Sequence, residues 1–449
     1  MSRTSQTLQQ LRAFESRNVT FLEPDGSWPI VWERARGVHV WDAEGEKYLD
    51  LTAAFGVAAA GHANPRIVRA GQRQMARLLH AMGDVHPHAL KAQLARELSR
   101  VTFGRWAKQM PKSPRRNPPT AKTIFCNSGF EAVEAALKTA LLATGRREVI
   151  AFTGGYHGLG YGALNATHRG HFRSPFRSQL GAFGRFAPFP TSARQLDEVD
   201  AALQRLFRRG RIGAVLVEPV QARGGVHIPP PEFLRRLRRL CDTHAALLIV
   251  DEIFTGFGRT GKWFACEHSG VTPDLICLGK AMTGGFPLSA CVGRADVMDA
   301  AWPPSQGEAI HTSTFLGHPV GCAMARAQLA EIRRMKLCER SARLGKRLLD
   351  ELRAQFKKAG RGVTVRGLGL MAGVELRQPD GSPATQRALA AIKTMLRAGF
   401  ILLPEGEHAN VISFTPPLTI TDAQLRRAGR ALGEVLGERE RAGRTARRA

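Results

Sequence analysis

Short apolar runs and amphipathic stretches alternate through the middle of the chain. The apolar runs lie at Thr123–Cys126, Glu148–Phe152, Ala214–Val217, Ala245–Val250, Leu275–Leu278 and Ala290–Val292. Near-continuous apolar runs of this length are typical of strands that are buried on both faces, and the amphipathic stretches between several of them indicate helices. The pattern over 122–294 therefore predicts an α/β fold with an open, mainly parallel sheet and helices on both sides.

The N-terminal part of the chain has a different pattern. Strand-like runs surround a turn at Ala43-Glu44-Gly45, and a loop rich in Gly and Ala precedes a helix that we expect over 65–79. Residues 108–121 contain four prolines among basic residues. This composition predicts an exposed connector.

The C-terminal part predicts a smaller α+β unit. Helical spacing over 325–356 is followed by elements that we expect in this order: strands within 363–376, a helix near 385–398, a strand within 410–418, and a last helix from about Thr421. A solvated basic tail is expected over 437–449. We therefore expect an N-terminal segment of a small domain (1–70), a large doubly wound domain (71–325) and a C-terminal small domain (326–449).

Composition narrows the class of protein. The 449 residues suffice for two or three lobes, and no run of 18 apolar residues suggests a membrane span. The polar N-terminus lacks the apolar core of a secretory signal. The 7 cysteines are scattered, odd in number and mostly within apolar runs, a pattern that favours reduced, buried side chains over a disulfide framework or a zinc site. These features predict a cytoplasmic protein without a membrane partner.

The net charge of +27 is high and has two interpretations. It can indicate a nucleic-acid partner, or it can reflect an Arg-rich surface. Of the 65 basic residues 52 are Arg, and they are spread over the whole chain, not gathered into one block with interleaved aromatic residues. This distribution favours the second interpretation, so no nucleic-acid partner is expected.

Polar residues follow the ends of several predicted strands, where open α/β sheets bind ligands. Ser128-Gly129-Phe130 opens a strong helical pattern, and free backbone N–H groups there suit a phosphate, although the same pattern can be a plain helix cap. Asp251 can bind a cation or a protonated ring nitrogen, or it can be a rim charge. Lys280 can be a surface lysine, or a partly desolvated amine that condenses with an aldehyde.

Two more strand ends carry polar or aromatic residues. Glu218 follows one strand, and Tyr156-His157 lies between glycines after another. Each signal is weak alone. Together they supply a phosphate cup, a carboxylate, a stacking surface and an amine, which is the set required by a cofactor with a phosphate, a cationic aromatic nitrogen, a flat ring and an aldehyde.

The segment "VDEIFTGFGRTGKWFACEHSGVTPDLICLGKAMTGG" resembles the signature of class III aminotransferases. Asp251 and Lys280 are 29 residues apart, which fits that signature. Further family blocks occur in the expected order, namely "NSGFEAVEAALKTA", "GGYHG", "EPVQ" and "HTSTFLGHPVGCAMA". The resemblance covers roughly residues 30–430.

The resemblance implies fold type I, a homodimer with shared active sites, and pyridoxal 5′-phosphate (PLP) bound to Lys280 as a Schiff base. Asp251 would pair with the pyridine nitrogen, and Glu218 would lie near the substrate side. The remaining cofactor contacts would come from Ser128, Gly129, Phe130, Tyr156, His157, Ile253 and, from the neighbouring subunit, Thr314 with Ser313. The implied reaction moves an amino group from a primary amine or ω-amino acid to a 2-oxo acid through pyridoxamine phosphate.

Two positions depart from the family. Family members often carry carboxylate-binding arginines where this chain has Leu159 and Ser413. An Arg–carboxylate fork gives bidentate recognition that Ser cannot replace, so acetylornithine, ornithine and 4-aminobutyrate are disfavoured as substrates. Substitute clamps could come from Arg169, Arg173, Arg177 or Arg259.

Two other functions remain open at this point. An aminomutase or amino-acid epimerase would use the same cofactor residues without net transfer to an added 2-oxo acid. A non-catalytic, basic nucleic-acid-binding protein is suggested only by the charge, and Lys280 with Asp251 argues against it.

Overall fold

The computed structural model describes residues 1–107, 121–356 and 362–445. The connector predicted over 108–121 therefore lies outside the described residues, except for Ala121, which begins a strand. None of the helices within these ranges has the length and apolar character that a membrane crossing requires.

A seven-stranded sheet forms the centre of the molecule, in the order β4-β10-β9-β8-β7-β5-β6. Its strands are β4 (Ala121–Cys126), β5 (Glu148–Phe152), β6 (Gly184–Ala187), β7 (Ile212–Val217), β8 (Leu247–Asp251), β9 (Leu275–Leu278) and β10 (Ser289–Arg294). All neighbours are parallel except β10, which is antiparallel to both β4 and β9. The sequence predicted six of these strands and missed β6.

Successive residues of the central strands enter different apolar clusters, which explains their continuous hydrophobicity. Leu248 and Val250 of β8 belong to one cluster, together with Leu237 of α10 (Glu232–Thr243). Ile249 belongs to the other, together with Ala136 of α6 (Gly129–Thr144). Helices therefore cover both faces of the sheet, as expected for an α/β fold.

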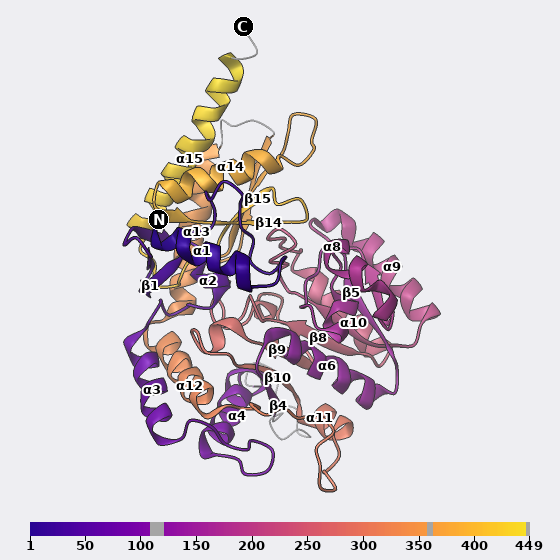
Figure 1. Ribbon diagram of the computed structural model, residues 1–449. Coiled ribbons are helices and arrows are strands. Elements are labelled where there is room, and N and C mark those ends of the chain that lie inside the picture. Colours follow the sequence, from indigo (N-terminus) through magenta and orange to yellow (C-terminus); the bar gives the residue numbers. More distant parts are fainter. Residues whose placement is uncertain (108–120, 357–361, 446–449) are drawn as a thin grey trace.

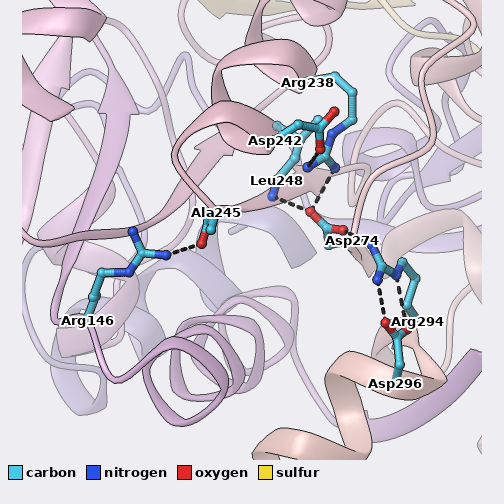
Figure 2. A network of polar contacts seen from close by, with 8 residues as sticks. All are labelled: Arg146, Arg238, Asp242, Ala245, Leu248, Asp274, Arg294 and Asp296. Carbon is cyan, nitrogen blue, oxygen red and sulfur yellow. Dashed lines mark hydrogen bonds and ion pairs between the residues drawn. The ribbon is translucent and has the colours of Figure 1, made fainter.

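The amino ends of β8, β9 and their neighbours are fastened by a polar network (Figure 2). Asp274, which is 2% exposed, accepts hydrogen bonds from Arg238 Nη1 (2.7 Å), Arg294 Nη1 (2.7 Å) and the backbone N–H of Leu248 (2.8 Å). Asp274 belongs to the "PD" pair of the motif quoted above. Since it precedes β9 whereas Lys280 follows it, Asp274 fixes the sheet at the edge opposite Lys280.

Two smaller sheets join distant parts of the chain. In the first, β1 (Trp32–Arg36), β2 (His39–Asp42) and β3 (Lys47–Asp50) are completed by β13 (Phe400–Ile401), which runs parallel to β3. The second is antiparallel and contains β11 (Val363–Gly367), β12 (Ala372–Leu376), β14 (Leu403–Glu405) and β15 (Val411–Phe414). Figure 1 shows the first and last parts of the chain on the same side of the molecule.

The main helices surround these sheets. They are α1 (Arg3–Phe14), α3 (Pro65–Arg77), α4 (Ala89–Val101), α9 (Leu196–Arg209), α11 (Ala295–Ala301), α12 (Pro319–Arg334), α13 (Leu337–Phe356), α14 (Thr385–Arg397) and α15 (Asp422–Thr445). The helical spacing over 325–356 corresponds to α12 and α13, which are separated near Lys336, a residue with φ 49°. The expectation of a tail over 437–449 is corrected in part, because the backbone of α15 remains helical through Thr445.

Candidate active site

The carboxyl ends of β5, β7, β8 and β9 lie at one edge of the central sheet. The end of β4 lies there too, because Cys126 pairs with Ser289 at the start of the antiparallel strand β10. Topology therefore brings most of the candidate residues to one edge, although they are spread over the sequence from 128 to 280.

Lys280 follows β9 and begins a short 3-10 turn, Lys280–Met282. Its φ of 39° is in the left-handed region, which costs a non-glycine residue energy and is common at functional sites. Nζ lies 4.7 Å from the centre of the Phe254 ring, and no hydrogen bond or ion pair of this amine occurs among the described residues. Burial lowers the pKa of Lys280, while Asp251 and Glu218 oppose that shift. The amine is thus shifted toward its neutral, nucleophilic form.

Asp251 is the last residue of β8 and is 5% exposed. Its Oδ2 lies 2.8 Å from Nδ1 of the buried His157, and its Oδ1 accepts a hydrogen bond of 3.1 Å from the backbone N–H of Ile253. His157 is held in turn by a hydrogen bond of 2.9 Å from its backbone N–H to Thr167 Oγ1. Both oxygens of the carboxylate are therefore fixed in orientation.

Ser128 is the N-cap of α6, and the first turn of this helix contains Gly129 and Phe130. The Oγ of Ser128 is buried without a hydrogen-bond partner in the part of the chain that the structure describes. A Cβ on Gly129 would stand 3.0 Å from Ile253 Cγ2, so a larger residue there would require the Ile253 side chain to shift. An unpartnered hydroxyl at a helix N-terminus is suited to an anionic oxygen such as a phosphate.

The loop after β5 packs directly on this helix start. Gly158 has φ 112°, and a Cβ there would stand 2.3 Å from Cβ of Phe130. Gly158, one of the glycines around Tyr156 and His157 that the sequence alone left as a weak signal, is therefore needed for the loop to approach α6 closely.

Glu218 follows β7 and is buried. Its two oxygens accept hydrogen bonds from the backbone N–H groups of Tyr156 (2.9 Å) and Ala222 (3.1 Å). Burial raises the pKa of Glu218 to about 7, with His157 opposing the shift and Asp251 adding to it. Glu218 thus anchors the Tyr156 loop and carries a carboxyl that titrates near neutral pH.

Ser313 and Thr314 are not brought to this group. Both are exposed in the segment between α11 and α12, and neither has a hydrogen bond to the residues around Lys280. The sequence assigned them to a site formed with a neighbouring subunit, and that assignment stays a prediction.

The residues considered for carboxylate binding have different surroundings. Leu159 is exposed, whereas Ser413 is buried in β15 between β12 and β14. Arg259 is 1% exposed, and its Nη1 donates to the carbonyl oxygens of Leu370 (2.9 Å) and Pro416 (2.6 Å). Arg259 therefore binds backbone through Nη1, while its Nη2 is buried without a hydrogen-bond partner among the described residues.

The structure adds two charged residues that the sequence interpretation missed. Arg223 lies with its guanidinium carbon 5.4 Å from the centre of the Tyr156 ring, and its Nε is 3.7 Å from Glu405 Oε2. Both Arg223 and Glu405 influence the pKa of Lys280. The only sequence signal for Arg223 was its place in "EPVQARGG", five residues after Glu218.

Comparisons with known proteins identify the family of this chain. The family model described as Aminotransferase class-III matches residues 22–436. The chain is 37% identical to 5-aminovalerate aminotransferase DavT of Pseudomonas aeruginosa, over 98% of this chain and 100% of the relative. It is 35% identical to 4-aminobutyrate aminotransferase GabT of Escherichia coli, over 91% of this chain and 94% of the relative.

A solved structure is also similar. It is an amine transaminase from an uncultivated Pseudomonas species in a PLP-bound form, with a TM-score of 0.83 and 28% identity. The match covers 95% of this chain and 98% of that structure.

Proposed function

Because this chain belongs to the class III aminotransferase family and is a PLP-dependent aminotransferase, we propose that it takes its amino group from a primary amine or an ω-amino acid and passes it to a 2-oxo acid. The observation that carries the proposal is the amine of Lys280, which makes no hydrogen bond in the described part of the chain and has the fixed carboxylate of Asp251 as an electrostatic neighbour. The ω-amino acid class is supported by the names of the relatives, which act on 5-aminovalerate and 4-aminobutyrate.

The residues present fit PLP. The unpartnered Oγ of Ser128 and the first turn of α6, with Gly129 and Phe130, would hold its phosphate. Asp251 would pair with the ring nitrogen, and Tyr156 would face the ring, with Ile253 packed beneath Gly129. When bound, PLP supplies an aldehyde carbon that accepts amino groups and a ring that withdraws electrons from the substrate carbon.

Lys280 has two tasks in this proposal. Its Nζ would carry the covalent link to the cofactor and, once free, would move the proton from the amine-bearing carbon of the substrate to the cofactor. The lowered pKa of Lys280 serves the second task, since only the neutral amine can accept a proton. His157 keeps Asp251 in place, and Glu218 anchors the loop that carries Tyr156.

We also retain the homodimer as a proposal, with Thr314 and Ser313 contributed across the interface. Ile310 is 75% exposed and Phe315 is 53% exposed, so this segment presents apolar side chains that a second subunit would bury. Size-exclusion chromatography with light scattering tests the dimer, and Thr314→Ala should weaken PLP binding without changing the mass.

A cytoplasmic location is proposed as well, supported by the seven buried, unpaired cysteines.

One experiment tests the function. Purified holoenzyme is examined for the near-visible absorption of the lysine-linked cofactor and is then mixed with a panel of amines and ω-amino acids. We expect conversion to the pyridoxamine form that stops until pyruvate or 2-oxoglutarate is added. Continued turnover without an acceptor would instead favour an aminomutase or epimerase. An unchanged absorption band in Lys280→Ala would overturn the assignment of Lys280.

A further inference from the structure

Arg223 has an unusual environment for a partly buried arginine. Its side chain is 33% exposed, yet it donates no hydrogen bond within the described residues, and its Nε is buried without a hydrogen-bond partner. Arg366, which contacts Gly225 two residues after Arg223, is hydrogen-bonded by contrast. Its Nε donates to the carbonyl oxygens of Gly225 and Val226, each at 3.0 Å. A guanidinium carries five N–H donors in a planar fork, and the four on Nη1 and Nη2 of Arg223 are unused within the described residues.

The nearest anion to Arg223 is Glu405, the last residue of β14. The distance of 3.7 Å between Nε and Oε2 exceeds a hydrogen bond, although the backbone N–H of Gly406 donates to the carbonyl oxygen of Arg223 at 3.1 Å. Glu405 is 6% exposed and accepts no hydrogen bond among the described residues. Burial raises its pKa to about 7, with Arg223, Lys280 and Arg169 opposing the shift. This carboxylate is therefore poorly stabilised where it lies.

The pair is placed beside the reacting amine. Arg223 lies against the Tyr156 ring, and both members of the pair act on the charge of Lys280. An arginine whose side chain makes no hydrogen bond to the described residues thus lies between the Tyr156 ring and Glu405, close enough to Lys280 to affect its pKa.

We infer that Arg223 binds the carboxylate of the amino donor, an ω-amino acid, and that Glu405 is the internal anion that occupies Arg223 between substrates. The inference rests on the proposed function and names the clamp that Leu159 and Ser413 do not provide. A substrate carboxylate that reaches Arg223 forms bidentate, charge-assisted hydrogen bonds, which Glu405 does not make. Amines without a carboxylate gain no binding affinity from Arg223.

Pentanoate is a suitable probe, because it has the carboxylate and chain length of 5-aminovalerate but no amine to react. Its dissociation constant is measured by calorimetry on the holoenzyme. We expect Arg223→Met to weaken pentanoate binding by about 10- to 100-fold, and the exposed Arg194→Met, which removes the same charge elsewhere, to leave it unchanged. Glu405→Gln should tighten binding, because it removes the competing anion.

The double variant Arg223→Met/Glu405→Gln guards against misfolding from an unpaired buried Glu405, and it should bind pentanoate as weakly as Arg223→Met. Pentanoate binding as tight as wild type in either Arg223 variant, no binding to wild type, or weaker binding in Glu405→Gln would each overturn the inference. Turnover of pentylamine separates the two proposals. If wild type converts pentylamine but Arg223→Met leaves pentanoate binding unchanged, only the inference about Arg223 is wrong. If wild type converts no amino donor but Arg223→Met weakens pentanoate binding, only the proposed function is wrong.

Discussion

The imidazole of His157 and the carboxylate of Asp251 form a buried pair, with Nδ1 and Oδ2 2.8 Å apart. The two residues come from different strand ends and are 94 positions apart in the sequence. Because the backbone N–H of Ile253 holds the other oxygen, the carboxylate has little freedom to rotate. A fixed carboxylate can keep a ring nitrogen protonated without reorganising during the reaction.

A pair of substitutions tests this positioning role of His157. His157→Asn retains an N–H donor near the position of Nδ1, whereas His157→Leu retains only bulk. We expect kcat to fall about 10- to 100-fold further in the Leu variant, and the near-visible absorption maximum of its cofactor to shift. Equal kcat values and unshifted spectra in both variants would show that the pair serves packing alone.

Asp274 provides a test of stability away from the site. Asp274→Asn leaves Arg238 and Arg294 without their buried counter-charge, and we expect the free energy of unfolding to drop by about 2 to 3 kcal/mol, a value reduced for the partial exposure of both arginines. Asp296→Asn removes an exposed partner of the same Arg294 and should cost less than about 0.5 kcal/mol. Urea unfolding measures both, and kcat/KM should stay near wild type in each.

Gly158 links the Tyr156 loop to the start of α6. An added Cβ would meet the Cβ of Phe130 at 2.3 Å in a backbone conformation with φ 112°, so Gly158→Ala must displace the loop or the helix. We expect the dissociation constant for PLP, measured by titrating the apoenzyme, to increase by about tenfold or more. Gly145→Ala is the matched control: φ is 62°, but the space around it is open, so only about 1 kcal/mol of stability should be lost.

The sequence predicted the fold well where burial is simple. Apolar runs such as Leu275–Leu278 are buried on both faces and became strands, whereas β6 (Gly184–Ala187) escaped notice because it is an edge strand with only Ala187 buried. The antiparallel direction of strand β10 could not be predicted, since a buried antiparallel strand between two others has the same apolar pattern as a buried parallel one.

The candidate site was predicted in part. Lys280, Asp251 and Ser128 follow strands directly, so their common edge could be inferred from the pattern. Arg223 and Glu405 could not be paired in this way, because 182 residues separate them and their contact depends on how β14 packs beside the central sheet. Conversely, Arg259 looked available in sequence, but tertiary packing buries it and directs its Nη1 to two backbone carbonyl groups.

Glu252 connects stability to pH. It is fully buried, where it accepts hydrogen bonds from the Thr255 hydroxyl and, at 2.8 Å, from the backbone N–H of Cys266. Burial raises its pKa to about 7 from an ordinary value of 4.5, so the folded protein binds a proton that the unfolded chain releases between these pH values. Its contribution to stability therefore decreases as pH rises from about 4.5 to 7, by about 3 kcal/mol in total.

Glu252→Gln removes this titration while keeping the shape of the side chain. We expect the variant to lose less stability than wild type between pH 5 and pH 8, as measured by urea midpoints at both pH values. Part of the dependence should persist, because burial also raises the pKa values of Glu218 and Glu405 to about 7. The exposed Glu198→Gln should follow wild type. A Glu252→Gln variant that loses as much stability as wild type over this range would show that Glu252 stays ionised in the folded protein, and that its hydrogen bonds outweigh the cost of its burial.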